Sequence, residues 1–292
     1  MSAGATASSS SSGRPLVVKI GGAAGVDLEN VCTDVAELVR RGERVIVVNG
    51  GSDAGERLLG ALGMERPEVT TANGNVVRLT YAPTLRALTM AWVGEVNKAV
   101  VLALLAKGVT ALGLCGADGR VLTARRRPPL KLQTGDGRMR IDREHLAGEV
   151  SSVNTALLGT LLEGGYVPVV CPPAVTEEGV LVNVDADAVA SALAVAVGAR
   201  ALIIISNVPG LLSDPKDPAT LVRASDDVQG CMALAGGRMR YKLEAVRRAL
   251  EGGVPTAYVS ASRVARPVFS ALEEAGGTKF TLRERTLADA GA

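Results

Sequence analysis

Short runs of β-branched residues alternate with longer Ala- and Leu-rich stretches along most of this 292-residue chain. Such alternation is typical of a mainly parallel sheet, because each helix carries the chain back to begin the next strand. Glycine follows most of the helical stretches, where a left-handed C-terminal cap is expected. The predicted strands are residues 16–20, 45–48, 110–114, 167–170, 201–205 and 256–259. The predicted helices are residues 27–41, 52–62, 82–107, 151–163, 186–197 and 238–251.

The composition is that of a globular protein with an aliphatic core. Hydrophobic residues make up 47% of the chain, but aromatic residues only 2%. The formal net charge of +2 provides no global attraction to nucleic acid or to a membrane. A single histidine, His145, excludes multi-histidine metal sites, and we expect no metal site built from protein ligands. The four cysteines form no CxxC pair, and the chain begins without the cationic and apolar segments of a secretion signal. We therefore expect free thiols and a cytoplasmic location.

Two predicted strands end in a Gly-Gly turn directly before a predicted helix. The first reads Val18-Lys19-Ile20-Gly21-Gly22, and the second reads Val48-Asn49-Gly50-Gly51-Ser52. Without a Cβ, backbone N–H groups can approach an anion closely. Lys19 adds a point charge suited to phosphate at the end of its strand. Glycines also end strands for steric reasons alone, but two such turns near one sheet edge indicate a site for phosphoryl groups.

Three further segments place polar side chains at the ends of predicted strands and helices. Asn183-Val184-Asp185-Ala186-Asp187 precedes an apolar helix, where one polar residue caps and the others could orient a lysine or hold magnesium through water. Ser206 to Leu211 follows a strand, where α/β sheets bind ligands. Gly236 to Lys242 opens a helix with three cations, which indicates either a bound anion nearby or a solvated basic face. No GxxxxGK[ST] occurs, so the chain is not a P-loop protein, and the absence of a GxGxxG after a strand disfavours a dinucleotide-binding Rossmann site.

Residues 121–142 interrupt the alternation and predict an inserted β-hairpin. Two strand-like runs, 130–132 and 139–141, flank a Gly135-Asp136-Gly137 turn. The segment is basic, and its densest cluster is Arg125, Arg126 and Arg127. Charge on an edge strand can simply block aggregation, but it can also form a docking surface for an acidic partner.

Taken in order, these segments resemble the amino acid kinase family, and within it the acetylglutamate kinase group. The resemblance covers roughly residues 15–275. Gly51-Ser52, the Asn-x-Asp-x-Asp run and the basic hairpin are similar to the branch that phosphorylates an amino acid attached to an amino-group carrier protein. The resemblance rests on Val18 to Gly22, Gly50-Gly51, Arg78, Asn97-Lys98, Asn183 to Asp185, Ser206 to Leu211 and Gly237 to Lys242.

The resemblance implies a three-layer α/β/α sandwich with a mostly parallel twisted sheet, two lobes and a basic β-hairpin insertion. Residues 14–198 would form an acceptor-binding lobe, and residues 199–276 would form an ATP-binding lobe. Residues 1–13 would be a disordered tail, and residues 277–292 would be a C-terminal tail. The family also implies a homodimer.

The resemblance assigns roles to particular residues of this chain. Lys19 and Lys242 would flank the transferring phosphoryl group, and Asp185 would orient both lysines. ATP would bring Mg²⁺, which its phosphates largely hold. Substrate binding would fall to Asn49, Gly50, Gly51, Arg78 and Asn183. Phosphate and nucleotide binding would fall to Gly21, Gly22, Asn207, Gly210, Leu211 and Met239.

The implied function is ATP-dependent phosphorylation of the side-chain carboxylate of 2-aminoadipate or glutamate on a small acidic carrier protein. The product would be an acyl phosphate for lysine-type biosynthesis, and Arg125 to Arg127 would dock the carrier. The first alternative is an acetylglutamate kinase of arginine biosynthesis, and the second is a non-catalytic sensor of the same fold. Two residues depart from the patterns: Asn49 stands where the carrier branch usually has histidine, and Leu181 where acetylglutamate kinases often have asparagine. Nucleic-acid binding is disfavoured because no aromatic residues interleave with the arginines.

Overall fold

The computed structural model describes residues 13–71, 76–133 and 139–283. The expected disordered tail of residues 1–13 lies outside this range except for its last residue. The expected Gly135-Asp136-Gly137 turn also lies outside the described residues.

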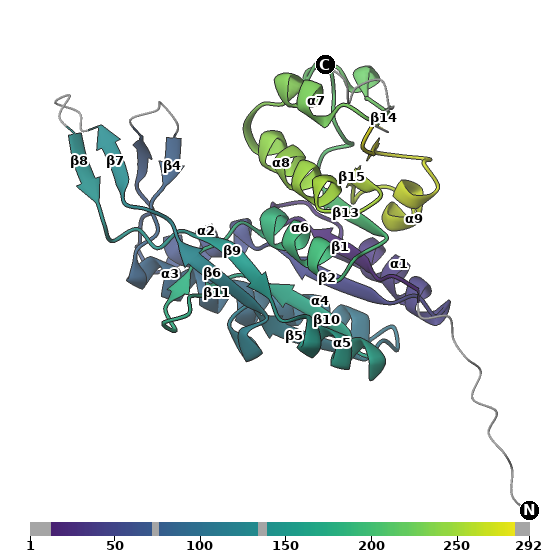
Figure 1. The fold of residues 1–292 in the computed structure, drawn as a ribbon, viewed down its shortest axis with the longest axis horizontal. Helices are drawn as coiled ribbons and strands as arrows, with labels where there is room; N and C mark the ends of the chain where they lie inside the picture. Colours follow the sequence, from purple (N-terminus) through teal and green to yellow (C-terminus); the bar gives the residue numbers. More distant parts are fainter. Residues whose placement is uncertain (1–12, 72–75, 134–138, 284–292) are drawn as a thin grey trace, which may run out of the picture.

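An eight-stranded sheet forms the centre of the molecule, in the order β14-β16-β15-β13-β1-β2-β10-β5 (Figure 1). The six strands from β15 to β5 are the six predicted ones, and they pair with one another in parallel. Their bounds are β1 (Leu16–Ile20), β2 (Val45–Asn49), β5 (Ala111–Cys115), β10 (Val167–Cys171), β13 (Ala201–Ser206) and β15 (Ala257–Ala261).

Two short strands complete one edge of this sheet, namely β14 (Ala224–Ser225) and β16 (Thr278–Phe280). β16 pairs antiparallel with β15, and Phe280 is fully buried. The expectation of a tail over residues 277–292 is therefore wrong for residues 278–280. Burial of Phe280 in the core supplies the apolar contact that holds this segment in place.

Helices cover both faces of the sheet, which confirms the three-layer sandwich. Alternate residues of each central strand face opposite cores, since side chains alternate along a strand. Val17, for example, packs in one core, whereas its neighbour Val18 packs in the other. The first core is closed by α5 (Thr155–Glu163), α6 (Ala186–Ala196) and α8 (Gly237–Glu251). The second is closed by α1 (Leu28–Arg40), α4 (Lys98–Leu105) and α9 (Pro267–Leu272).

Two predicted helices differ from the structure. The predicted 82–107 helix is a continuous rod of three parts, α3 (Ala82–Thr89), a π-helix (Met90–Asn97) and α4. The predicted 151–163 helix begins only at Thr155, after its cap Asn154, because residues 148–153 form β9. Tertiary pairing of β9 with β6 (Leu122–Arg126) overrides the local pattern there.

The 82–105 rod also meets the length and composition of a membrane-spanning helix. Its mean hydropathy reaches 1.5 over an 18-residue window, and 39% of that window is buried. The buried side includes Leu88 and Trp92, whereas Met90, Leu102 and Leu105 are exposed.

A second, smaller sheet and two hairpins lie beside the main sheet. The smaller sheet has the order β12-β11-β6-β9, with β11 (Ala174–Val175), β12 (Leu181–Val182) and β9 (Gly148–Val153). The hairpins are β3 (Glu68–Thr70) with β4 (Val76–Arg78), and β7 (Leu130–Gln133) with β8 (Met139–Asp142). Figure 1 shows both hairpins projecting together at the end of the molecule opposite α7 (Val228–Leu234) and α9.

The predicted basic hairpin insertion is thus present as β7 and β8. Arg125 and Arg126, however, belong to β6 of the smaller sheet, and Arg127 follows directly. All three are exposed. Arg126 donates to the backbone oxygens of Arg143 and His145, so it anchors the end of the hairpin. The remaining elements are α2 (Ser52–Ala61) and two single turns, Asp118–Arg120 and Pro218–Thr220.

Candidate active site

A pocket of about 400 Å³ opens where the carboxyl ends of β1, β2 and β13 meet the first turns of α2, α6 and α8. This edge of a parallel sheet is where such folds bind ligands. Eleven predicted residues line the pocket: Lys19, Gly21, Gly22, Gly50, Gly51, Arg78, Asn183, Asp185, Asn207, Met239 and Lys242.

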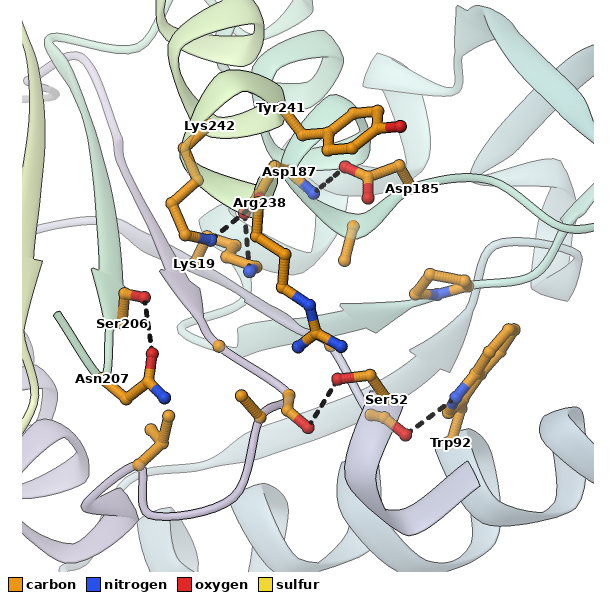
Figure 2. Close-up of a pocket in the computed structure, with 18 of the residues that line it drawn as sticks. Lys19, Ser52, Trp92, Asp185, Asp187, Ser206, Asn207, Arg238, Tyr241 and Lys242 are labelled. Atoms are coloured by element: carbon orange, nitrogen blue, oxygen red, sulfur yellow. Dashed lines mark hydrogen bonds and ion pairs between the residues drawn. The ribbon is translucent and has the colours of Figure 1, made fainter. Parts of the chain in front are cut away.

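The two predicted lysines meet at one buried carboxylate, that of Asp187. Lys19 Nζ lies 2.6 Å from Oδ1 of Asp187, and Lys242 Nζ lies 3.0 Å from Oδ2. The side chain of Lys19 is only 6% exposed, that of Lys242 is 11% exposed and that of Asp187 is 7% exposed. Figure 2 shows the two ammonium groups side by side beneath the carboxylate. The pair of lysines expected at the phosphoryl group is therefore assembled by the fold.

The carboxylate that orients the lysines is not the predicted one. Asp185 caps α6, and its carboxylate accepts from the N–H groups of Asp187 at 2.9 Å and Ala188 at 3.1 Å. A capping carboxylate is turned back on its own helix. Asp187 lies two residues further, and its side chain reaches across to β1 and α8. The role expected of Asp185 as the contact of both lysines belongs to Asp187.

The charges of this cluster shift each other's protonation. Burial alone would raise the pKa of Asp187, but the ammonium groups of Lys19 and Lys242 outweigh burial and hold it below its ordinary value. Burial, and then the positive charge of Lys19, lower the pKa of Lys242. The protein atoms surrounding Asp185 exclude part of the solvent and raise the pKa of its carboxyl group, and the nearby negative charge of Asp187 raises it further. One side of the Asp185 side chain still faces the open pocket. Asp187 is thus held ionised between the two cations.

The two Gly-Gly turns contact each other across the pocket floor. A Cβ on Gly22 would lie 2.1 Å from the backbone nitrogen of Gly51, so only glycine fits there. Ser52 Oγ donates to Gly22 O at 3.0 Å, which ties the turns together.

The predicted backbone donors divide into two kinds. The N–H groups of Gly21 and Gly50 donate to Ile205 O and Ile20 O in the sheet, so they are not available to a ligand. The N–H groups of Gly22 and Gly51 have no acceptor within the described part of the chain. Two adjacent free donors at the pocket floor suit a phosphate oxygen.

The π-helical turn supports the second glycine turn from behind. Trp92 Nε1 donates to Gly51 O at 3.0 Å. Asn97 Nδ2 donates to Asn49 Oδ1 at 2.9 Å and to Val169 O at 2.8 Å. Asn49 is only 1% exposed and does not line the pocket, so the expectation that it contacts substrate is wrong. Asn49 instead fixes the turn through Asn97.

Two arginines and one carboxylate gather at the end of the pocket nearest the hairpins. Glu56 accepts from Arg66 at 3.0 Å and from Arg78 at 3.2 Å. Arg66 also donates to Thr80 Oγ1 at 3.0 Å, and Asn183 Nδ2 donates to the same oxygen at 3.4 Å. The predicted Arg78 and Asn183 are thus brought together at one end. A planar guanidinium suits a carboxylate ligand there.

The opposite end carries part of the predicted nucleotide set. Asn207 and Met239 line the pocket, but Gly210 and Leu211 do not. Leu211 is 1% exposed, and its N–H donates to Thr278 Oγ1 at 2.8 Å. These two residues therefore hold the β13 loop against β16, and the expectation of a direct ligand contact is not supported for them.

Several pocket residues were absent from the predicted site. They include Ser52, Glu56, Arg66, Trp92, Asp187, Ser206, Arg238 and Tyr241. Asp187 and Arg238 carried a chemical signal in the sequence, as a third polar residue beyond the need of a cap and as a cation at a helix start. Ser52 and Tyr241 appeared only as parts of segments that carry the family resemblance. Trp92 lies mid-helix in an apolar run, and nothing local sets it apart.

Two further predictions concern protein metal ligands and the position of the arginine cluster. Among the described residues, no three His, Cys, Asp or Glu side chains gather in a way that could hold a metal ion. Arg125, Arg126 and Arg127 do not line the pocket.

A lysine pair on one carboxylate, free N–H groups at glycine turns and a parallel sheet define a phosphoryl-transfer fold. The sequence pattern of the amino acid kinase family matches residues 14–260, and the chain belongs to this family. The chain is 40% identical over 266 residues to the LysW-aminoadipate kinase of Thermus thermophilus, covering 89% of this chain and 98% of that protein. It is 38% identical over 259 residues to the acetylglutamate kinase of Trichormus variabilis, covering 86% of this chain and 82% of that protein.

Solved structures show the same fold at low identity. The N-acetylglutamate synthase from Neisseria gonorrhoeae superimposes with a TM-score of 0.73 at 23% identity, over 93% of this chain and 60% of that one. The carbamate kinase from Giardia lamblia bound to AMP-PNP gives a TM-score of 0.64 at 17% identity, over 93% of this chain and 99% of that one. The resemblance seen in the sequence, its fold class and the phosphotransferase class are confirmed.

Proposed function

We propose that this protein is an ATP-dependent kinase that phosphorylates the side-chain carboxylate of 2-aminoadipate, or of glutamate, attached to an amino-group carrier protein. The observation that carries the proposal is the pairing of Lys19 and Lys242 on Asp187, facing the free N–H groups of Gly22 and Gly51. The 40% identity to a LysW-aminoadipate kinase supports this acceptor over a free metabolite.

The site suits attack by a carboxylate. A carboxylate is ionised at neutral pH, so it needs no general base, and positioning with charge neutralisation carries the reaction. Lys19 and Lys242 would neutralise charge on the transferring phosphoryl oxygens, and Asp187 would keep both ammonium groups in place. Arg78 and Asn183 would hold the acceptor at the hairpin end of the pocket.

The nucleotide would enter from the side of Asn207 and Met239. The residues fit a polyphosphate, because two free N–H donors and an excess of cations face the pocket. Mg²⁺, bound with the nucleotide, would supply further neutralisation of phosphate charge. Phosphate oxygens and water would hold the ion, since the described residues offer no carboxylate cage.

Carrier docking would involve the exposed Arg125, Arg126 and Arg127 beside the hairpins. These arginines lie outside the pocket, and the side chains of Arg125 and Arg127, which have no partner among the described residues, are free to meet a small acidic protein. Residues 14–198 would form the acceptor lobe, and residues 199–276 the nucleotide lobe, of a cytoplasmic enzyme.

A homodimer would bury the exposed side of the 82–105 rod. Met90, Leu102 and Leu105 are 58%, 64% and 47% exposed, and Leu112 of the neighbouring edge strand is 37% exposed. Large apolar side chains exposed along one rod and its neighbouring edge strand are candidates for burial in such an interface.

The test is trapping of the acyl phosphate with hydroxylamine. We expect hydroxamate from ATP with the carrier conjugate, and none from the Lys19→Ala or Lys242→Ala variants. Robust turnover of free N-acetylglutamate, with none of the conjugate, would instead identify an acetylglutamate kinase, the alternative that the 38% identical relative favours. Wild-type activity in both lysine variants would contradict the mechanism. Absence of transfer to either acceptor would indicate the non-catalytic sensor.

A further inference from the structure

Arg238 is the second residue of α8, and its side chain extends from that helix into the pocket (Figure 2). It lines the pocket together with Lys19 and Lys242. Unlike Lys242, it is exposed to solvent. Across residues 13–71, 76–133 and 139–283, no oxygen accepts a hydrogen bond from its guanidinium and no carboxylate pairs with it.

This position is unfavourable for an unpaired cation. The N-terminal turn of a helix carries partial positive charge, which repels Arg238. The neighbouring ammonium groups of Lys19 and Lys242 add like charge, which the carboxylates of Asp187 and Asp185 offset without pairing with Arg238 itself. The other exposed arginine that lines the pocket, Arg78, is paired with Glu56 and Glu68. An anion bound in the pocket would remove the repulsion.

The donors of Arg238 complement those of the lysines. Each lysine has three N–H donors and forms an ion pair with Asp187, to which Lys242 also donates one hydrogen bond. Arg238 has five N–H donors in a planar fork, and none of them is committed. A phosphoryl group in transfer spreads its charge over three equatorial oxygens. Two lysine ammonium groups and one guanidinium fork match that demand.

We propose that Arg238 is a third cation of the phosphoryl-transfer site, and that its guanidinium binds the oxygens of the transferring phosphoryl group. The proposal rests on the proposed function and adds a catalytic residue to it. The acceptor carboxylate oxygen forms the new bond to the γ-phosphorus. The bond from that phosphorus to the β–γ bridging oxygen breaks, and its electron pair leaves on ADP. No proton moves, and Arg238 stays protonated throughout.

The experiment compares Arg238→Ala and Arg238→Lys with Arg240→Ala in the hydroxamate assay. Arg240 is the matched control, because it is an exposed arginine of the same helical turn that does not line the pocket. For Arg238→Ala we expect kcat and kcat/KM to fall together by about a hundredfold or more, with the KM for ATP nearly unchanged. Arg238→Lys should lose less, because it keeps the charge but not the fork. Arg240→Ala should behave as wild type.

Chemical rescue separates a catalytic role from a structural one. Added guanidinium ion should restore part of the kcat of Arg238→Ala at concentrations that leave its Tm unchanged, and should not affect Arg240→Ala. Activity of Arg238→Ala equal to that of Arg240→Ala would overturn the proposal. A raised KM for ATP at unchanged kcat would also overturn it, because that result assigns Arg238 to ground-state nucleotide binding. A wild-type protein without kinase activity would fail before any variant is compared, and would overturn the proposed function itself.

Discussion

Lys19 Nζ contacts Oδ1 of Asp187 at 2.6 Å, so the end of strand β1 is joined to the first turn of α6 by a buried ion pair. Lys242 completes the cluster on the other carboxylate oxygen. One carboxylate therefore sets the spacing of two cations that come from opposite ends of the chain. Buried charges of this kind are costly unless they are paired, which makes the cluster sensitive to single substitutions.

Substitution of Asp187 is predicted to lower activity and stability much more than substitution of Asp185, the N-cap of α6. Asp187→Asn leaves two buried ammonium groups without a counterion, so we expect kcat to fall at least about a hundredfold and stability to fall by about 3–5 kcal/mol. Asp185→Asn keeps a good helix cap, so it should lower the free energy of unfolding by less than about 1 kcal/mol. Steady-state kinetics and urea unfolding of both variants check this. Equal losses in the two variants would contradict the assignment of Asp187.

The contact between the glycine turns predicts a steric effect. Gly22→Ala places a Cβ 2.1 Å from Gly51 N, so the turns must separate and kinase activity should be lost. Gly60→Ala is the control, because a Cβ at this exposed position of α2 meets nothing within 4 Å. Removing glycine from a helix should raise stability by about 0.5–1 kcal/mol. Normal activity of Gly22→Ala would show that the turns need not touch.

Trp92 is the single tryptophan of the chain and lines the pocket, so its fluorescence reports on the acceptor end. We expect the acceptor to change its emission, and Arg78→Ala to weaken the fitted affinity about 10- to 100-fold, as lost charge-assisted hydrogen bonds do. Arg86→Ala, an exposed arginine of α3, should leave the titration unchanged. An unaltered affinity in Arg78→Ala would remove Arg78 from the acceptor site.

Carrier docking is tested with Arg125→Glu and Arg127→Glu in combination, because neither side chain has a partner among the described residues. Arg126 is kept, since it anchors Arg143 and His145. The carrier KM should rise steeply, and more so at low salt, where surface charges are least screened. Arg40→Glu on α1 should have no such effect. An unchanged carrier KM would refute docking on these arginines.

His145 predicts a pH dependence of stability. Its Nδ1 accepts from Thr80 N at 2.9 Å, and burial lowers its pKa below the ordinary 6.5. The folded state therefore favours the neutral ring, so this contribution is complete above pH 6.5 and is lost as the pH falls toward the folded pKa. Urea unfolding between about pH 5 and 8 should show a slope that His145→Asn reduces. An identical slope in that variant would exclude His145 as its source.

Much of the fold could be predicted because its signals are local. Most of the central strands are short β-branched runs that follow a helical stretch and its closing glycine, and all six predicted strands are present. The start of α5 could not be predicted, because residues 151–153 become a strand only by pairing with β6. The burial of Phe280 under the sheet edge is likewise a long-range effect.

The sequence by itself determined the parallel α/β class, the two Gly-Gly turns and the two lysines, since strand pattern, turn chemistry and charge are properties of neighbouring residues. Only the tertiary structure decided that Asp187 rather than Asp185 contacts the lysines, and that Asn49 supports a turn instead of facing a ligand. Acids two residues apart look equivalent along the chain. Their roles separate because the cap turns back on its own helix, whereas packing of α6 against β1 and α8 brings the other carboxylate to both cations.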